Sequence, residues 1–96
     1  MNVEQLRLDL ERDEGCVYAV YLDHLGYPTF GIGHLVTEAD PEHGQPVGTE
    51  VSEDRVREAF NSDIECVIGD CDRAFDDFGS LPEGVQLVIA NMIFNL

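Results

Sequence analysis

The sequence contains no lysine, and its five arginines face twenty aspartates and glutamates, which gives a formal net charge of −15 at pH 7. Proteins that bind a phosphate backbone neutralise it with clustered lysine and arginine side chains. The charge therefore argues against a nucleic-acid partner. Hydrophobic residues make up 44% of the chain, too many for an acidic disordered tail, so we expect the chain to fold.

Long apolar runs are also missing. No run approaches the roughly 20 residues of a membrane-spanning helix. The N-terminal stretch MNVEQLRLDLERDEG is charged, whereas a signal peptide needs a continuous apolar segment. We therefore expect no membrane partner and synthesis in a cytoplasm without a signal peptide.

Motifs for metal, redox or nucleotide chemistry are absent as well. The three cysteines have no C-x-x-C or Cys/His ligand spacing, and the chain has no H-E-x-x-H, G-x-S-x-G or P-loop. Gly31 and Gly33 do not form a dinucleotide fingerprint, because Val36 stands where the third glycine belongs. We predict no metal and no cofactor.

Local patterns predict one small α+β domain over residues 1–96. We expect a helix over about residues 3–13, an antiparallel hairpin from 16–22 and 27–32, a long loop over 37–51, a long helix after residue 52 and a final buried helix. In this interpretation residues 1–51 form a helix-plus-sheet part with the candidate catalytic residues, and residues 52–96 are helical.

Residues at the expected boundaries support these elements. Asn2 and Gln5 have the spacing of a capping box, Gly15 suits a left-handed helix end, and Ser52 is a suitable N-cap. Pro28 cannot donate to a ladder and is expected at an edge or at the start of its strand. Pro82 is expected at the first position of the last helix.

The last segment, VQLVIANMIFNL, is apolar around most of a helix, which is typical of burial on several sides. The preceding residues can cover one side at most. We therefore expect that the chain is C-terminally truncated or that it needs a partner.

Three polar side chains are expected to converge on one groove. Glu14 falls in the last turn of the first helix, Asp23 in the hairpin turn and Thr29 on the returning strand. The helix dipole disfavours the charged form of a carboxyl group at a helix C-terminus, as a general acid requires, whereas Asp23 in an open polar turn is expected to stay ionised. Two carboxyl groups in contrasting environments are typical of glycoside hydrolysis.

The residue order strengthens this interpretation. It reads Glu14-Gly15, then Tyr21-x-Asp23-x-x-Gly26-x-x-Thr29-x-Gly31-x-Gly33-His34, which fixes nine residue types over 21 positions. The order resembles the phage-type lysozymes, the muramidases and endolysins of glycoside hydrolase family 24. The similarity continues through Val47-Gly48, Phe60-x-x-Asp63, Leu81-Pro82 and Asn91-Met92-x-Phe94-Asn95-Leu96, and so covers essentially the whole chain.

The resemblance implies a reaction and its residues. Glu14 matches the family's catalytic acid, which protonates the β-1,4 glycosidic oxygen between N-acetylmuramic acid and N-acetylglucosamine in peptidoglycan. Asp23 and Thr29 match the residues that orient the attacking water, and the reaction inverts the anomeric centre. Such enzymes leave roughly 6.5 to 9.5 Å between the two carboxyl groups.

The resemblance also implies supporting residues. Leu35, Phe94 and Asn95 match positions that line or adjoin the saccharide cleft. His34 matches a structural histidine that forms an ion pair with a helix aspartate, here Asp63. The partner is the peptidoglycan glycan strand, and the enzyme acts on the cell wall after release from the cell.

The resemblance implies a further part of the fold. Family members continue into a C-terminal helical lobe beyond the position of residue 96, so we expect this lobe to be missing here, or to be supplied in cis or in trans. Two alternatives stay open at this point: a truncated, inactive lysozyme-like fragment, and an acidic decoy that imitates DNA, which the charge alone supports.

Overall fold

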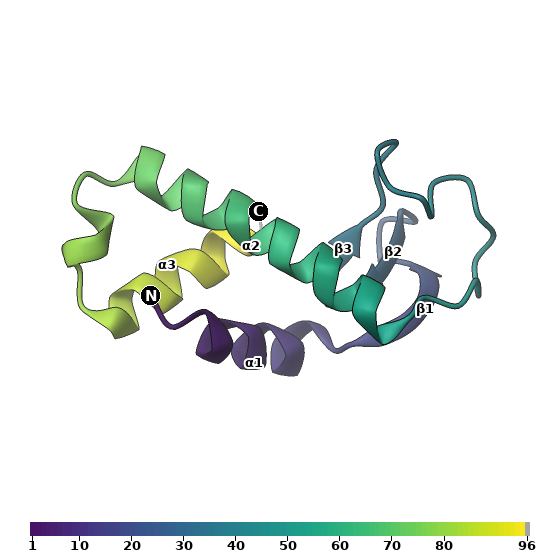
Figure 1. The fold of residues 1–96 in the computed structure, drawn as a ribbon, viewed down its shortest axis with the longest axis horizontal. Helices are drawn as coiled ribbons and strands as arrows, with labels where there is room; N and C mark the ends of the chain where they lie inside the picture. Colours follow the sequence, from purple (N-terminus) through teal and green to yellow (C-terminus); the bar gives the residue numbers. More distant parts are fainter. Residues whose placement is uncertain (96) are drawn as a thin grey trace. The chain divides into compact units, whose positions relative to one another are not determined.

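The computed structural model of the chain describes residues 1–95, and Leu96, the last residue of the expected domain, lies outside them. The predicted α+β class is confirmed (Figure 1). The elements in chain order are α1 (Val3–Glu14), β1 (Val17–Leu22), β2 (Pro28–Gly31), β3 (His34–Leu35), α2 (Glu53–Ala74), the 3-10 helix η1 (Phe78–Ser80) and α3 (Glu83–Phe94).

The described chain divides into two compact units. Glu14–Phe60 forms the sheet unit, and Met1–Asp13 together with residues 61–95 forms the helical unit. Helix α2 contributes residues to both, and the expected division after residue 51 falls inside the sheet unit.

Local hydrogen bonding sets the two ends of α1. The Asn2 side chain accepts a hydrogen bond from the backbone N–H of Gln5 at 3.0 Å, which is the expected N-cap. Gly15 follows the helix with φ +77°, a conformation that glycine adopts without a steric cost. The helix therefore ends at Glu14, one residue beyond the prediction.

The sheet is antiparallel, with strand order β1-β2-β3. Pro28 opens β2, as expected from its missing N–H group, and pairs with Leu22. The third strand was not predicted, because its two residues, His34 and Leu35, are too few to show an alternating pattern. Gly31 and Gly33 have φ of +64° and +63°, which lets the chain turn between β2 and β3.

The sheet unit has its own apolar core. Five buried side chains form it: Val20, Phe30, Val51, Val56 and Ala59. The partly buried Cys16 and Val36 pack against them. Gly31 lies against this core, because a β-carbon there would lie 3.0 Å from Val56 Cγ1. The packing fixes β2 against the first turns of α2.

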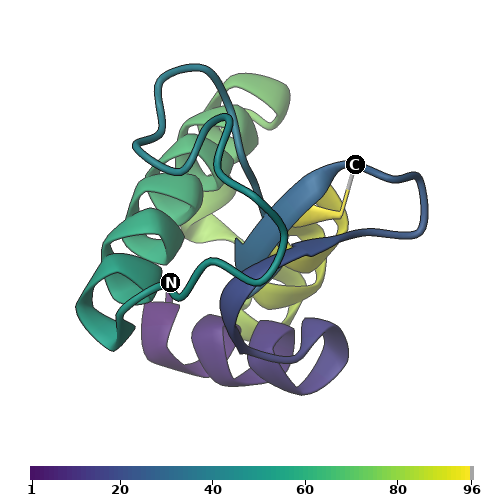
Figure 2. The same cartoon turned by 90° about the vertical axis from the view of Figure 1, so that its right-hand side faces the viewer.

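The predicted loop over residues 37–51 contains no regular element until its end (Figure 2). There Glu50 forms an isolated antiparallel bridge with Ala19, and Val20 exchanges backbone hydrogen bonds with Gly48 and Thr49 at 2.7 and 2.9 Å. The last residues of the loop thus bond to β1.

A cluster of ion pairs joins this loop to α2. Arg55 Nε donates to Glu42 at 2.9 Å, Nη2 to Asp40 at 2.9 Å and Nη1 to Glu58 at 2.8 Å. The guanidinium carbon also lies 5.5 Å from the centre of the Phe30 ring. We call Arg55, Asp40 and Glu42 the loop cluster.

Helix α2 begins where predicted. The Ser52 hydroxyl accepts a hydrogen bond from the backbone N–H of Arg55 at 3.1 Å, which is the expected N-cap. The buried side chains recur at helical spacing and form one stripe: Val56, Phe60, Ile64, Val67 and Cys71.

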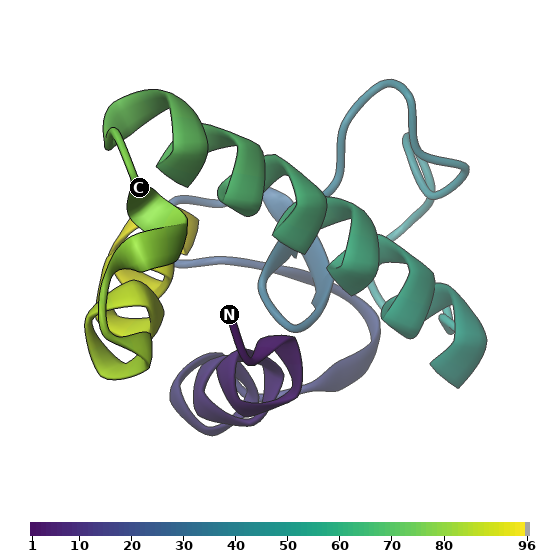
Figure 3. The same cartoon turned by 60° about the vertical axis from the view of Figure 1, so that its left-hand side comes forward.

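Helix α3 follows η1 after a turn of the chain (Figure 3). The prediction for Pro82 was wrong by one position, because Pro82 is the N-cap and Glu83 is the first helical residue. Pro82 has extended backbone angles, and its carbonyl accepts the first helical hydrogen bond, from Gln86 at 3.0 Å. The Gln86 side chain also donates to the carbonyls of Gly79 and Leu81 at 3.2 and 2.9 Å.

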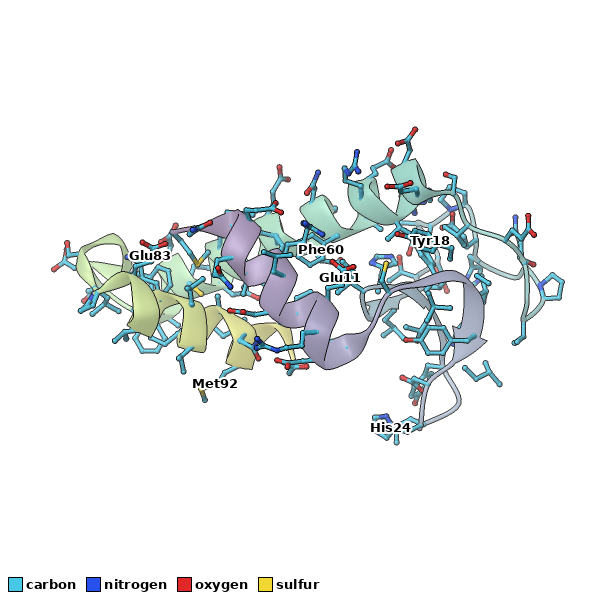
Figure 4. The ribbon with its side chains drawn as sticks, turned by 90° about the horizontal axis from the view of Figure 1, so that it is seen from below. Glu11, Tyr18, His24, Phe60, Glu83 and Met92 are labelled. Carbon is cyan, nitrogen blue, oxygen red and sulfur yellow. The ribbon has the colours of Figure 1, made fainter. Side chains whose placement is uncertain are left out.

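The described residues bury α3 on one side, which is the coverage expected of the preceding part of the chain. Gln86 and Ala90, four residues apart, are its fully buried residues. Val85, Val88 and Met92 share another side and are exposed, with Met92 at 65%, and Figure 4 shows Met92 pointing away from the helix. The described residues therefore cover one side of α3. None of the helices in residues 1–95 has the length and apolar character needed to cross a membrane.

Candidate active site

Glu14 occupies the junction of the first helix and the sheet. It is the last residue of α1, and the left-handed turn at Gly15 directs the chain into β1. The Glu14 side chain lies against the backbone of Gly33. It forms no hydrogen bond and no ion pair with any residue of the part of the chain that the structure describes.

Asp23 is held by the hairpin turn that it starts. Its Oδ1 accepts hydrogen bonds from the backbone N–H groups of Leu25 and Tyr27 at 2.9 and 2.8 Å. Its backbone N–H donates to the Tyr27 carbonyl, and its carbonyl accepts from the Gly26 N–H, both at 2.9 Å. This Asx turn fixes one carboxylate oxygen, while Oδ2 has no hydrogen-bond partner within residues 1–95.

Thr29 is buried in β2, with 4% of its surface exposed. It pairs with Tyr21 of β1 on one side and with Leu35 of β3 on the other. Its hydroxyl donates to the Tyr27 carbonyl at 3.0 Å. The proton of this hydroxyl is therefore committed to the backbone.

The three predicted catalytic residues line one pocket of about 300 Å³ within the sheet unit. Leu35, predicted to adjoin the saccharide, lines it as well. Its full lining is Glu14, Tyr21, Asp23, His24, Leu25, Tyr27, Thr29, Gly33 and Leu35. The expected convergence of Glu14, Asp23 and Thr29 on one hollow is thus present.

Sequence reasoning did not assign Tyr21, His24, Leu25 and Tyr27 to this pocket. Tyr21 had a detectable signal, because it precedes Asp23 by two residues and alternate residues of a strand share a face. The others lie at or after the turn, where His24 is at the hairpin tip (Figure 4). Their place depends on the turn geometry and has no periodic pattern.

The Tyr21 hydroxyl lies in the electric field of both carboxylates. Burial of the side chain is the largest cause that raises its pKa, and the negative charges of Glu14 and Asp23 raise it further. The phenol therefore keeps its proton across the neutral pH range.

His34 has a partner that the sequence did not reveal. Its Nε2 lies 2.9 Å from Oδ2 of Asp40, and its ring lies 4.9 Å from the Phe30 ring. The predicted partner, Asp63, belongs to the helical unit, so the pair of His34 with Asp63 stays a prediction.

Phe94 and Asn95 also belong to the helical unit, and their predicted role near the saccharide stays a prediction. Asn95 has a local role at the end of α3, where its side-chain amide donates to the Asn91 carbonyl at 2.8 Å and contacts the Asn91 side chain at 3.0 Å. Within residues 1–95, no three His, Cys, Asp or Glu side chains are grouped so that they could hold a metal ion.

No protein-family model and no curated protein matches this chain.

Proposed function

We propose that this chain is a lysozyme-like glycoside hydrolase that cleaves the β-1,4 bond between N-acetylmuramic acid and N-acetylglucosamine in bacterial peptidoglycan. The observation that carries the proposal is that Glu14, Asp23 and Thr29 line one pocket although they come from a helix end, a turn and a strand. The resemblance of their order along the chain to the phage-type lysozymes supplies the reaction class.

In this proposal Glu14 is the general acid. Its carboxyl group is exposed and has no protein partner in the described chain, so it is available to the glycosidic oxygen. Donating its proton to that oxygen neutralises the leaving alkoxide as the bond to the anomeric carbon breaks. The reaction then needs a nucleophile from the opposite face of the sugar.

Asp23 and Thr29 hold the nucleophile, which is a water molecule. The two N–H donors from Leu25 and Tyr27 keep the Asp23 carboxylate in place, and Oδ2 can accept a proton from the water. Thr29 offers a lone pair to the other proton, because its own proton bonds the Tyr27 carbonyl. Attack of this water inverts the anomeric configuration.

Exposed apolar side chains at the pocket fit the carbon faces of a sugar. Leu25, Tyr27 and Leu35 line the pocket, and at least half of the surface of each is exposed. Small-molecule sites combine such surfaces with a few fixed polar groups. The volume is at the lower end of the usual range, which suits the sugar at the cleaved bond and leaves the rest of the strand outside.

The test is clearing of a peptidoglycan suspension by the purified chain. We expect weak clearing or none by the unaltered chain alone and clearing when a C-terminal helical lobe is added in trans. With the lobe present we expect no clearing by Glu14→Gln and unchanged clearing by Glu38→Gln, the same chemical change in an exposed loop residue of the same unit. Proton NMR of the first product should show the inverted anomer. A retained anomer, or equal clearing by Glu14→Gln, would remove Glu14 from its role.

The same assay decides between the enzyme and its alternatives. A folded chain that leaves peptidoglycan intact under all salt conditions even with the lobe present contradicts the proposal and favours an inactive lysozyme-like protein. Competition by DNA for a DNA-binding protein, without clearing, favours the acidic decoy.

A further inference from the structure

Tyr21 is a half-buried polar residue of the pocket to which the proposed reaction has given no role so far. It lies on β1 directly opposite Thr29 of β2, so the two side chains stand on the same face of the sheet. Both line the pocket together with Glu14 and Asp23. Tyr21 is half-buried there, whereas the pocket's other tyrosine, Tyr27, is exposed.

The hydroxyl of Tyr21 senses both carboxylates. The Tyr21 side chain lines the same pocket as Glu14 and Asp23, and burial together with the negative charges of both carboxylates raises the pKa of its phenol. Because both neighbours are negative, the phenol stays protonated and remains a hydrogen-bond donor.

The attacking water of the proposed reaction has no hydrogen-bond donor for one of its lone pairs. A water molecule has two protons and two lone pairs. Ionised Asp23 can only accept, and Thr29 also acts as an acceptor because its proton is committed to the Tyr27 carbonyl at 3.0 Å. Both protons of the water are then used, one lone pair attacks the sugar, and the second lone pair needs a donor.

We propose that Tyr21 is a positioning residue that donates its phenolic proton to the second lone pair of the attacking water, and so aims the first lone pair at the anomeric carbon. This role rests on the proposed function. In the step the water oxygen bonds the anomeric carbon, the glycosidic bond breaks, Glu14 gives its proton to the leaving oxygen and Asp23 takes one from the water. Tyr21 keeps its proton throughout.

The kinetic test compares Tyr21→Phe with the unaltered chain and with Tyr18→Phe, a matched change on the same strand outside the pocket. We expect Tyr21→Phe to lower kcat about tenfold, the effect of one neutral hydrogen bond, with KM unchanged and Tyr18→Phe without effect. An unchanged kcat, or a change in KM alone, overturns the proposal.

The pH profile separates this role from a contact with the acid. A donor to the water lowers kcat equally at all pH values, so the alkaline limb, which reports the loss of the Glu14 proton, stays in place. A donor to the Glu14 carboxylate stabilises its charged form, so its removal in Tyr21→Phe would move that limb to higher pH. Such a move overturns the proposal.

A titration tests the placement without any activity. The phenolate absorbance of the unaltered chain minus that of Tyr21→Phe isolates Tyr21 among the three tyrosines. We expect Asp23→Asn and Glu14→Gln each to lower the pKa of Tyr21, and no shift with Asp23→Asn overturns the proposal. Failure of the unaltered chain to cleave peptidoglycan with the lobe present overturns the proposed function and the kinetic role with it, whereas the titration still reports whether the phenol faces both carboxylates.

Discussion

The side chain of Glu14 lies against the backbone of Gly33, at contact distance from the position that a β-carbon would take. A β-carbon on Gly33 would lie 3.3 Å from Glu14 Oε2 and 3.6 Å from its Cγ, and the φ of +63° at Gly33 is one that other residues rarely adopt. The backbone conformation thus favours glycine beside the proposed acid, and a β-carbon there would shift the end of the Glu14 side chain by a few tenths of an ångström.

We predict that Gly33→Ala reduces clearing of peptidoglycan more than it reduces stability. The positive φ costs about 1–2 kcal/mol of unfolding free energy, and the new methyl group also displaces the Glu14 carboxyl group. Gly44→Ala is the control, because Gly44 has φ +82° and no atom within 4 Å of an added β-carbon. It should lose similar stability in urea denaturation and keep full activity; equal activity losses in both variants would contradict the role of the contact.

Two substitutions should separate the structural role of Asp23 in the turn from its proposed role as a base. Asp23→Asn keeps the Oδ1 acceptor for the N–H groups of Leu25 and Tyr27, so we expect stability within about 0.5 kcal/mol of the unaltered chain and activity reduced at least about 100-fold. Asp23→Ala also loses the two hydrogen bonds, and should cost about 1–3 kcal/mol in addition. Clearing rates and urea denaturation measure the two effects, and an active Asp23→Asn would exclude Asp23 as the base.

The loop cluster should make stability depend on acidic pH. The hydrogen bond from Arg55 is the largest cause that lowers the pKa of Glu42, with burial opposing it. Burial alone would raise the pKa of Asp40, but hydrogen bonds from the Thr37 N–H and His34 outweigh it and lower that pKa too. Since both values lie below those of the unfolded chain, about 4, this stabilisation is complete above that pH and is lost as pH falls through the folded-state values.

Arg55→Met tests the cluster. We expect a loss of about 2–3 kcal/mol at pH 7 and a smaller loss at acidic pH, as Asp40 and Glu42 become protonated at their lowered pKa values. Arg57→Met is the control, because Arg57 makes one exposed ion pair with Glu53 at 3.5 Å and should cost less than about 0.5 kcal/mol. Equal losses at both pH values for Arg55→Met would show that the cluster is not the source of the pH dependence.

The predicted ion pair of His34 with Asp63 calls for a double-mutant cycle. We expect His34→Gln and Asp63→Asn to show a coupling energy of about 1 kcal/mol near pH 5 and less near pH 8, because the pair is ionic only while the imidazole is protonated. The cycle of His34 with Asp40, whose atoms lie 2.9 Å apart, gives the comparison within the sheet unit. No coupling at either pH would exclude the His34–Asp63 pair.

Salt should increase the rate of clearing. Peptidoglycan is anionic and this chain carries a net charge of −15, so the two repel at low ionic strength. The screening length falls from about 30 Å at 0.01 M to about 8 Å at 0.15 M salt, which weakens the repulsion. The measurement is the initial clearing rate over this range, and a rate that decreases with salt would contradict the expectation.

Helix ends and the hairpin could be predicted because their determinants are local. Asn2, Gly15 and Ser52 act on groups within three residues of themselves, so their sequence context contains the whole interaction. The bond between Arg55 and Asp40 spans 15 residues and has no periodic pattern, and it was missed. The same holds for His34 with Asp40, where a resemblance suggested another carboxylate.

The sequence predicted some residues of the candidate site and not others. The spacing predicted that Glu14, Asp23 and Thr29 lie at a helix end, a turn and a strand, and the resemblance to the phage-type lysozymes selected them from the other polar residues. Strand alternation predicts that Tyr21 shares a face with Asp23, but an uncharged side chain gives no direct sign of a role in proton transfer. Leu25 and Tyr27 could not be assigned, since the turn that orients them depends on the two hydrogen bonds to Asp23.

The exposed apolar side of α3 gives the negative charge of the chain a further consequence, because charge repulsion opposes the association of copies through this side. Contiguous exposed apolar side chains promote association, and Val88 and Met92 are 60% and 65% exposed. Copies that approach one another through them each carry −15, which keeps them apart while the screening length is long. We therefore expect added salt, which would favour the approach of the chain to an anionic wall in the proposed function, also to favour association of its copies through the exposed side of α3.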